Sequence, residues 1–155
     1  MRQTMKGLVV YDSVYGNTKA VAEMIAAGIR SEGHEATVQS AKDDMPERTD
    51  SDFVIIGSPT RMGRMTRASR SFIKGLNKST WTKPFGFFDT VMQGVVEKKG
   101  STAAQRLYDL AEERGLDART PLFHAMVTGM RGPLQENTAD NAKAFVKDFL
   151  ASIRH

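Results

Sequence analysis

A short run of small, hydroxylated and turn-forming residues, Ser13-Val14-Tyr15-Gly16-Asn17-Thr18, separates an apolar run from a run with helical periodicity. The hydroxyls of Ser13 and Thr18 can each donate a hydrogen bond to a phosphate oxygen. Gly16 allows a tight turn, and Asn17 tolerates a left-handed conformation or, like Thr18, can cap the helix. Because backbone N–H groups at the positive end of a helix attract anions, this run predicts a phosphate site.

Two further runs follow later apolar segments in the same way. The first is Gly57-Ser58-Pro59-Thr60-Arg61-Met62-Gly63, which ends the most apolar segment of the chain. The second is residues 89–94, where Thr90, Met92 and Gly94 are candidates by position alone. Each run also has an ordinary interpretation, since any strand-to-helix junction needs turn and cap residues.

Several other chemistries are disfavoured by residues that the sequence does not contain. The Gly-x-x-x-x-Gly-Lys-Ser/Thr pattern of nucleoside triphosphatases and the Gly-x-Gly-x-x-Gly dinucleotide pattern are both absent. There is no cysteine, which excludes disulfides, thiolate metal sites and a cysteine nucleophile. The three histidines, at positions 34, 124 and 155, lack metal-ligand spacing. We therefore expect no metal site and name no catalytic side chain.

The composition is that of an ordinary globular protein. The chain has 155 residues, 40% hydrophobic and 26% charged, and we expect residues 1–155 to form a single domain. The first residues are polar, and no apolar run approaches a membrane span, so the expected location is cytoplasmic. The formal charge of +4 favours anionic partners but is too small to indicate a nucleic-acid-binding protein.

Strands and helices are expected to alternate along the whole chain. Apolar and β-branched runs predict strands at 6–12, 34–40, 52–59, 84–89 and 122–127. Helical periodicity predicts helices at 19–30, about 66–76, from a cap at Ser101 to Gly115, and 138–153. Alternation of this kind predicts an α/β three-layer sandwich, a five-stranded parallel sheet of order 2-1-3-4-5 with helices on both faces. A ligand would bind outside the carboxyl ends of strands 1 and 3.

The first loop, Tyr11-Asp12-Ser13-x-Tyr15-Gly16-Asn17-Thr18, resembles the phosphate-binding loop of the flavodoxin-like family. It is most similar to the Ser-x-Tyr-Gly-x-Thr form found in flavodoxin domains of flavodiiron-type proteins and in quinone oxidoreductases of the tryptophan-repressor-binding-protein type. The resemblance implies a flavodoxin-like fold. It also implies that Ser13, Val14, Tyr15, Gly16, Asn17 and Thr18 hold the phosphate of FMN without a charged side chain.

The second loop is similar to the Gly-Ser-Pro-Thr-Arg-Phe-Gly loop of those quinone oxidoreductases. The resemblance implies that Pro59 and Thr60 shape the loop and that Arg61, Met62 and Gly63 meet the edge of the flavin ring. Met62 replaces the family's frequent phenylalanine, which changes the group available for stacking. The segment 129–134 also resembles a turn of relatives, and we interpret it as structural.

Arg61, Arg64, Arg67 and Arg70 recur every three residues, with Lys74 following. We expect them to form a slanting row on one helix face beside the ligand. The row is either a solvated face or a docking site for an acidic redox partner or the anionic groups of NAD(P)H. Trp81 is expected to be a core or loop anchor.

These features favour an FMN-binding electron carrier that acts between redox partner proteins. An FMN-dependent NAD(P)H:quinone or small-molecule oxidoreductase is the alternative, supported by the second loop and the basic row. A phosphate-binding or receiver-like module is disfavoured, because only Asp12 stands where a receiver domain has an acidic cluster. His124 is expected to be a buried histidine with a hydrogen-bond partner.

Overall fold

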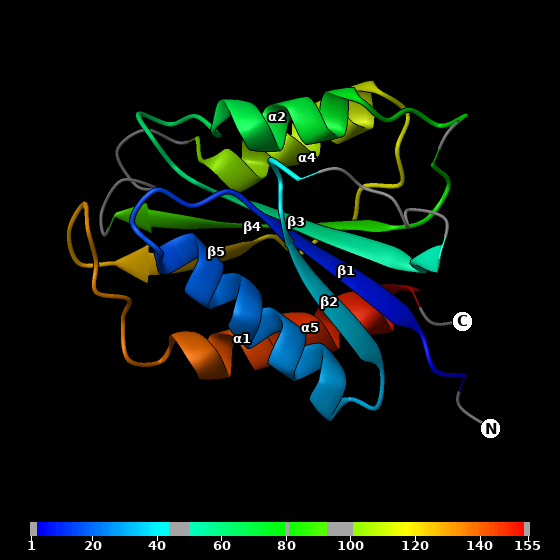
Figure 1. Ribbon diagram of the computed structural model, residues 1–155, viewed down its shortest axis with the longest axis horizontal. Helices are drawn as coiled ribbons and strands as arrows, with labels where there is room; N and C mark the ends of the chain where they lie inside the picture. Colours follow the sequence, from blue (N-terminus) through cyan, green and yellow to red (C-terminus); the bar gives the residue numbers. More distant parts are fainter. Residues whose placement is uncertain (1–2, 44–49, 80, 93–100, 154–155) are drawn as a thin grey trace.

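The five strands form one parallel sheet, in a computed structural model that describes residues 3–43, 50–79, 81–92 and 101–153 (Figure 1). The strands are β1 (Lys6–Tyr11), β2 (Glu35–Ser40), β3 (Phe53–Pro59), β4 (Phe85–Met92) and β5 (Phe123–Val127). Their order is β2-β1-β3-β4-β5, and every neighbouring pair is parallel. The predicted fold and strand order are confirmed.

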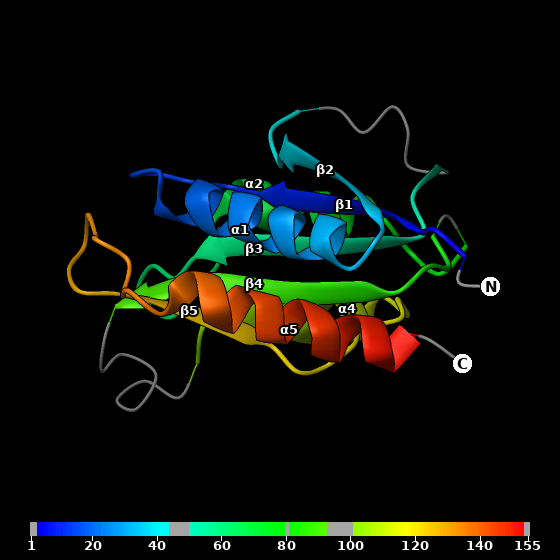
Figure 2. The ribbon, with the colours of Figure 1, turned by 90° about the horizontal axis from the view of Figure 1, so that it is seen from below.

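Helices cover both faces of this sheet. They are α1 (Asn17–Ser31), α2 (Arg67–Lys74), α4 (Ala103–Glu113) and α5 (Thr138–Ile153). α1 lies beside α5 on one face (Figure 2), and α2 lies beside α4 on the other (Figure 1). None of the helices in the described ranges is long and apolar enough to cross a membrane.

The two faces of the central strands explain their continuous apolar sequences. Val9 and Ile55 point into the core beneath α1 and α5, whereas Val10 and Ile56 point into the core beneath α2 and α4. Successive residues of a strand face opposite sides, so a strand covered on both sides needs apolar residues at every position. The edge strand β2 has only one neighbour, β1, and its residues are exposed or half-buried.

The end of β3 is positioned by close packing against β4. A Cβ atom on Gly57 would lie only 2.2 Å from Cζ of Phe88, whose ring occupies the space above the glycine. Phe88 is fully buried. The absence of a side chain at Gly57 therefore leaves room for the Phe88 ring to lie across the end of β3, just before the chain enters the second loop.

The N-terminal caps of two helices differ from the predictions. α1 is capped by Gly16, which has a φ of 91°, and no side chain caps it, so Asn17 and Thr18 are its first helical residues. The cap of α4 is Thr102, whose hydroxyl accepts from the N–H of Gln105, because the Ser101 hydroxyl instead accepts from Arg106 Nε.

β4 is longer than predicted. Thr90, Val91 and Met92 pair with residues 125–127 of β5, and Thr90 also pairs with Pro59. The predicted third loop therefore begins inside the strand, because partners on both sides extend the ladder. Gly94 lies outside the described residues.

Candidate functional site

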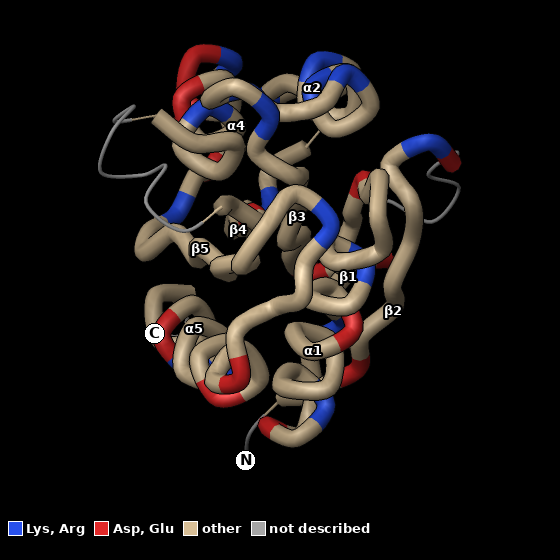
Figure 3. The backbone as a smooth tube through the Cα atoms, turned by 90° about the vertical axis from the view of Figure 1, so that its left-hand side faces the viewer, with Lys and Arg blue, Asp and Glu red and all other residues tan. Residues whose placement is uncertain are grey.

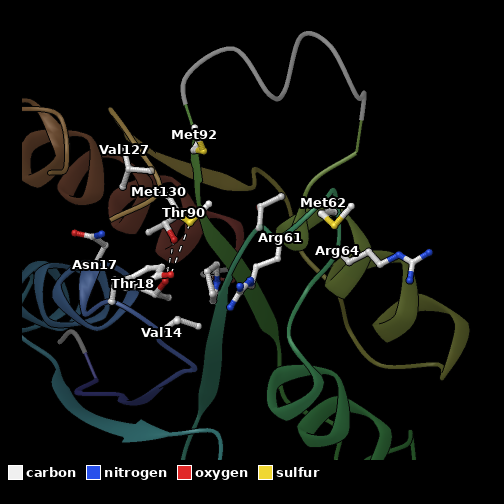
Figure 4. Close-up of a pocket in the computed structure, with 13 residues that line it drawn as sticks. Val14, Asn17, Thr18, Arg61, Met62, Arg64, Thr90, Met92, Val127 and Met130 are labelled. Carbon is white, nitrogen blue, oxygen red and sulfur yellow. Dashed lines mark hydrogen bonds between the residues drawn. The ribbon is translucent and has the colours of Figure 1, made fainter. Parts of the chain in front are cut away.

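A pocket of about 650 Å³ opens at the carboxyl ends of β1, β3, β4 and β5 (Figure 4). The predicted residues that line it are Val14, Tyr15, Asn17, Thr18, Pro59, Thr60, Arg61, Met62, Thr90 and Met92. Ser13, Gly16 and Gly63 do not line it, although they belong to its loops. The residues predicted from separate parts of the sequence are thus brought together around one cavity.

The first loop leaves backbone donors free at the start of α1. Gly16 N–H donates to the Ser13 hydroxyl over 3.0 Å, which closes the turn. In the described ranges, no hydrogen-bond acceptor contacts the N–H groups of Asn17, Thr18 and Lys19, the first three residues of α1. The first turn also lacks an acidic side chain. Free N–H groups at the positive helix end suit an anion.

Thr18 and Thr90 join the first loop to β4. Their hydroxyl oxygens are 2.8 Å apart, and either can be the donor (Figure 4). Both side chains are buried, and both line the pocket. A hydroxyl has a single hydrogen to donate, so Thr18 can donate to an anion while it accepts from Thr90.

The second loop ends in a tight turn. Arg61 N–H donates to the carbonyl of Arg64 over 2.9 Å, and Arg64 N–H donates back over 3.0 Å. The two residues between them, Met62 and Gly63, have φ values of 53° and 79°. Positive φ is ordinary for glycine but unusual for methionine. Met62 is 96% exposed at the tip of this turn, so its side chain is free to contact a ligand or partner.

The first turn of α4 holds the second loop in place. Ala103 N–H donates to the Thr60 hydroxyl over 3.0 Å, and Arg106 Nε donates to the carbonyl of Gly63 over 3.1 Å. At the start of the loop, the Ser58 hydroxyl accepts from the N–H of Thr66 over 2.9 Å. The loop conformation is therefore fixed by the helices on that face of the sheet.

The segment after β5 packs against the first loop. The Tyr15 hydroxyl donates to Met130 Sδ over 3.7 Å, and the Arg131 guanidinium lies 5.5 Å from the centre of the Tyr15 ring. A Cβ on Gly132 would lie 2.8 Å from Asn17 Oδ1. The structural interpretation of this segment is incomplete, because Met130 also lines the pocket.

Three lining residues were not among the predicted site residues: Arg64, Val127 and Met130. Val127 ends β5, so its position follows from the rule that the carboxyl ends of parallel strands share one edge of the sheet. Arg64 belongs to the arginine repeat, and its closeness to Arg61 depends on the tight turn between them. Met130 had no signal in the sequence pattern.

A buried carboxylate and a histidine pair between β4 and β5, beneath α4. Asp89 is fully buried and accepts from Ala104 N–H over 2.9 Å. His124 Nδ1 lies 2.9 Å from the same carboxylate. The hydrogen bond to Asp89 raises the pKa of His124 although partial burial opposes the change. His124 therefore has a partner, as predicted, but it is half-buried instead of buried, and it does not line the pocket.

The arginine row is not one helix face. Only Arg67, Arg70 and Lys74 belong to α2, whereas Arg61 and Arg64 face each other across the tight turn that precedes the helix. The prediction of one slanting helical row is wrong because Met62 and Gly63 take left-handed conformations that end helical periodicity there. All five cations are exposed.

Comparison with known proteins identifies a family and several relatives that match part of this chain. A flavodoxin-domain family model matches residues 8–124. A flavodoxin of Aquifex aeolicus is 36% identical over 78 residues, covering 49% of this chain and 42% of the relative. A protein named NAD(P)H dehydrogenase (quinone) from Gluconacetobacter diazotrophicus is 33% identical over 88 residues, covering 43% of this chain and 44% of the relative. The match spans less than half the length of both relatives.

Solved structures share the fold at lower sequence identity. A flavodoxin from the domain Archaea superposes with a TM-score of 0.79 at 23% identity, covering 97% of this chain and all of that chain. The rubredoxin oxygen:oxidoreductase of Desulfovibrio gigas gives a TM-score of 0.71 at 21% identity, covering 97% of this chain and 37% of that chain.

Proposed function

Because the chain belongs to the flavodoxin family, whose model matches residues 8–124, we propose that it binds one FMN non-covalently and carries electrons between redox partners. The main support for FMN binding is the pocket. It joins free backbone N–H groups at the start of α1 to an apolar opening beside the second loop. A volume of about 650 Å³ is typical of a small-molecule site.

The residues of the first loop suit a phosphate. Gly16 gives the turn, the free N–H groups of Asn17 and Thr18 are donors, and the Ser13 and Thr18 hydroxyls add two more. Val14 and Tyr15 line the pocket beside them. Charge on the phosphate is balanced here by dipoles instead of a cationic side chain.

The residues of the second loop and the end of β4 suit the flavin ring. Pro59 and Thr60 shape the loop, Arg61 and Met62 meet the ring edge, and Gly63 allows the tight turn that holds them there. Thr90 and Met92 line the pocket from β4. When bound, FMN supplies one-electron and two-electron redox chemistry, and the protein supplies its position and electrostatic environment.

A second function, an FMN-dependent NAD(P)H:quinone oxidoreductase, is supported by the second loop and by the relative from Gluconacetobacter diazotrophicus. Stopped-flow mixing of the FMN-loaded protein with NADPH under anaerobic conditions separates the two functions. A carrier is reduced only slowly by NADPH and rapidly by a reduced protein partner. Rapid loss of the flavin absorbance on mixing with NADPH alone would contradict the carrier function and favour the enzyme.

A further inference from the structure

The positive charge of the protein is concentrated in one segment. Between Asp52 and Asp89 the sequence contains seven Lys or Arg residues and no Asp or Glu. Subtracting these seven charges from the formal net charge of +4 leaves −3 for the rest of the chain. The basic character is therefore a property of the second loop, α2 and the loop that follows α2.

Five of these cations form what we call the basic surface: Arg61, Arg64, Arg67, Arg70 and Lys74. None of them has an ion-pair partner in the ranges that the structure describes. Figure 3 views the end of the molecule at which the strands finish and shows the Lys and Arg positions of α2 with no acidic position among them. A cluster of positive charges without neighbouring negative charges creates an electric field that attracts an acidic surface.

The basic surface continues into the mouth of the pocket. Arg61 and Arg64 line the pocket, and Arg64 extends away from Thr18 and Thr90 in Figure 4. All the large hydrophobic side chains that are exposed in the described ranges also line it: Val14, Tyr15, Met62, Met92 and Met130. An apolar centre with a charged border is the usual composition of a protein interface, and methionine adapts to different partner shapes.

We propose that an acidic redox protein docks on the basic surface, with its redox centre over the pocket mouth; this rests on the proposed function. One electron then passes from the reduced centre of the partner to the flavin, so the partner is oxidised and the flavin is reduced. No covalent bond forms or breaks between the two proteins. The cations orient the partner and speed its encounter.

The extent of the basic surface favours a protein over a dinucleotide. Seven residue steps from Arg67 to Lys74 span about 10 Å along α2, and this helix leads away from the second loop. The phosphates of NAD(P)H would be bound by two or three cations at the mouth, such as Arg61 and Arg64. The three cations of α2 do not line the pocket, and their spread along the helix fits the larger anionic surface of a protein.

The test measures binding to a plant-type [2Fe–2S] ferredoxin, a small acidic protein, immobilised for surface plasmon resonance at several NaCl concentrations. The double variant Arg67→Glu/Arg70→Glu reverses two exposed charges on α2. The control, Lys143→Glu/Lys147→Glu, makes the same net change at exposed positions of α5 on the opposite face. We expect the α2 variant to raise the Kd about tenfold or more and to weaken the salt dependence, and the control to change the Kd less than about twofold.

Equal effects of the two double variants, or no effect of the α2 variant, would overturn the proposal. So would normal ferredoxin binding together with lost reduction by NADPH in the α2 variant, which would assign the surface to the dinucleotide. The binding is measured with and without added FMN. Failure to take up FMN contradicts the proposed function and the electron transfer that rests on it, even if ferredoxin still binds. FMN uptake without ferredoxin binding contradicts only the docking surface.

Discussion

Thr18 is the residue on which the proposed phosphate site depends most. It is 1% exposed, lies 2.8 Å from the Thr90 hydroxyl, and belongs to the first turn of α1. No cationic side chain is needed if several neutral donors surround the anion. Each donor then contributes the energy of a hydrogen bond to a charged group, which is about 1.5–3 kcal/mol.

Replacing this hydroxyl by a methyl group tests that contribution. The substitution Thr18→Val keeps the volume of the buried side chain, and we expect it to weaken FMN binding about tenfold to a hundredfold. Thr37→Val, at an exposed position of β2, is the matched control and should leave the affinity unchanged. Isothermal titration calorimetry with FMN measures both. An unchanged Kd for Thr18→Val would show that the hydroxyl does not hold the phosphate.

The backbone conformation of Met62 is a feature of the site that the sequence motif did not predict. The motif predicted contact with the flavin ring, and the structure places the side chain 96% exposed at the tip of a turn with a φ of 53°. Backbone strain in a non-glycine residue often accompanies a functional loop. The sequence could not show this conformation, because the left-handed turn is imposed by the pairing of Arg61 with Arg64 and by α4.

At the scale of elements, β4, β5 and α4 are joined by the Asp89–His124 pair. Asp89 lies directly beside His124 in the parallel ladder and also binds the first turn of α4. That turn contacts the second loop through Thr60 and Gly63. A proton on His124 therefore stabilises a carboxylate that supports one wall of the site.

The raised pKa of His124 predicts how stability depends on pH. Its pKa is raised from 6.5 in the folded protein, so the stabilisation is fully present below about pH 6.5 and is lost as the pH rises through the raised value. Urea unfolding between about pH 6 and pH 8 should show a falling free energy of unfolding. His124→Gln can still donate to Asp89 but does not titrate, so its curve should be flatter. A wild-type curve that does not fall over this interval would contradict the assignment.

The boundaries of helices and strands were predictable only where they depend on nearby residues in the sequence. α5 begins where its periodicity predicted, at Thr138, and is helical to the last described residue, Ile153. Gly33 and Gly115 follow α1 and α4 with positive φ, as expected of helix terminators. The end of β4 and the cap of α4 depend on tertiary partners, namely residues 125–127 of β5 and the side chain of Arg106, which a local pattern does not contain.

At the scale of the whole molecule, strand alternation was enough to predict which loops meet. The order β2-β1-β3-β4-β5 brings the ends of β1 and β3 side by side, so two runs separated by about forty residues form one pocket. Met130 enters the same pocket because the segment after β5 packs on Tyr15. That contact depends on side-chain packing between loops and could not be read from periodicity.

The charge distribution is the second property of the whole molecule that bears on function. The sequence predicted a row of cations beside the ligand, and the fold places two of them, Arg61 and Arg64, at the pocket mouth. The same charges spread evenly would have no directional effect on a partner. The position of these cations therefore matters more than their number.

A titration of the flavin-free protein with FMN and, separately, with riboflavin tests whether the pocket binds FMN through its phosphate. Flavin fluorescence reports binding, and riboflavin lacks only the phosphate. We expect one FMN to bind per chain and riboflavin to bind at least about tenfold more weakly, because the donors at the start of α1 hold the phosphate. Absence of FMN binding, or equal affinity for the two flavins, would contradict this expectation.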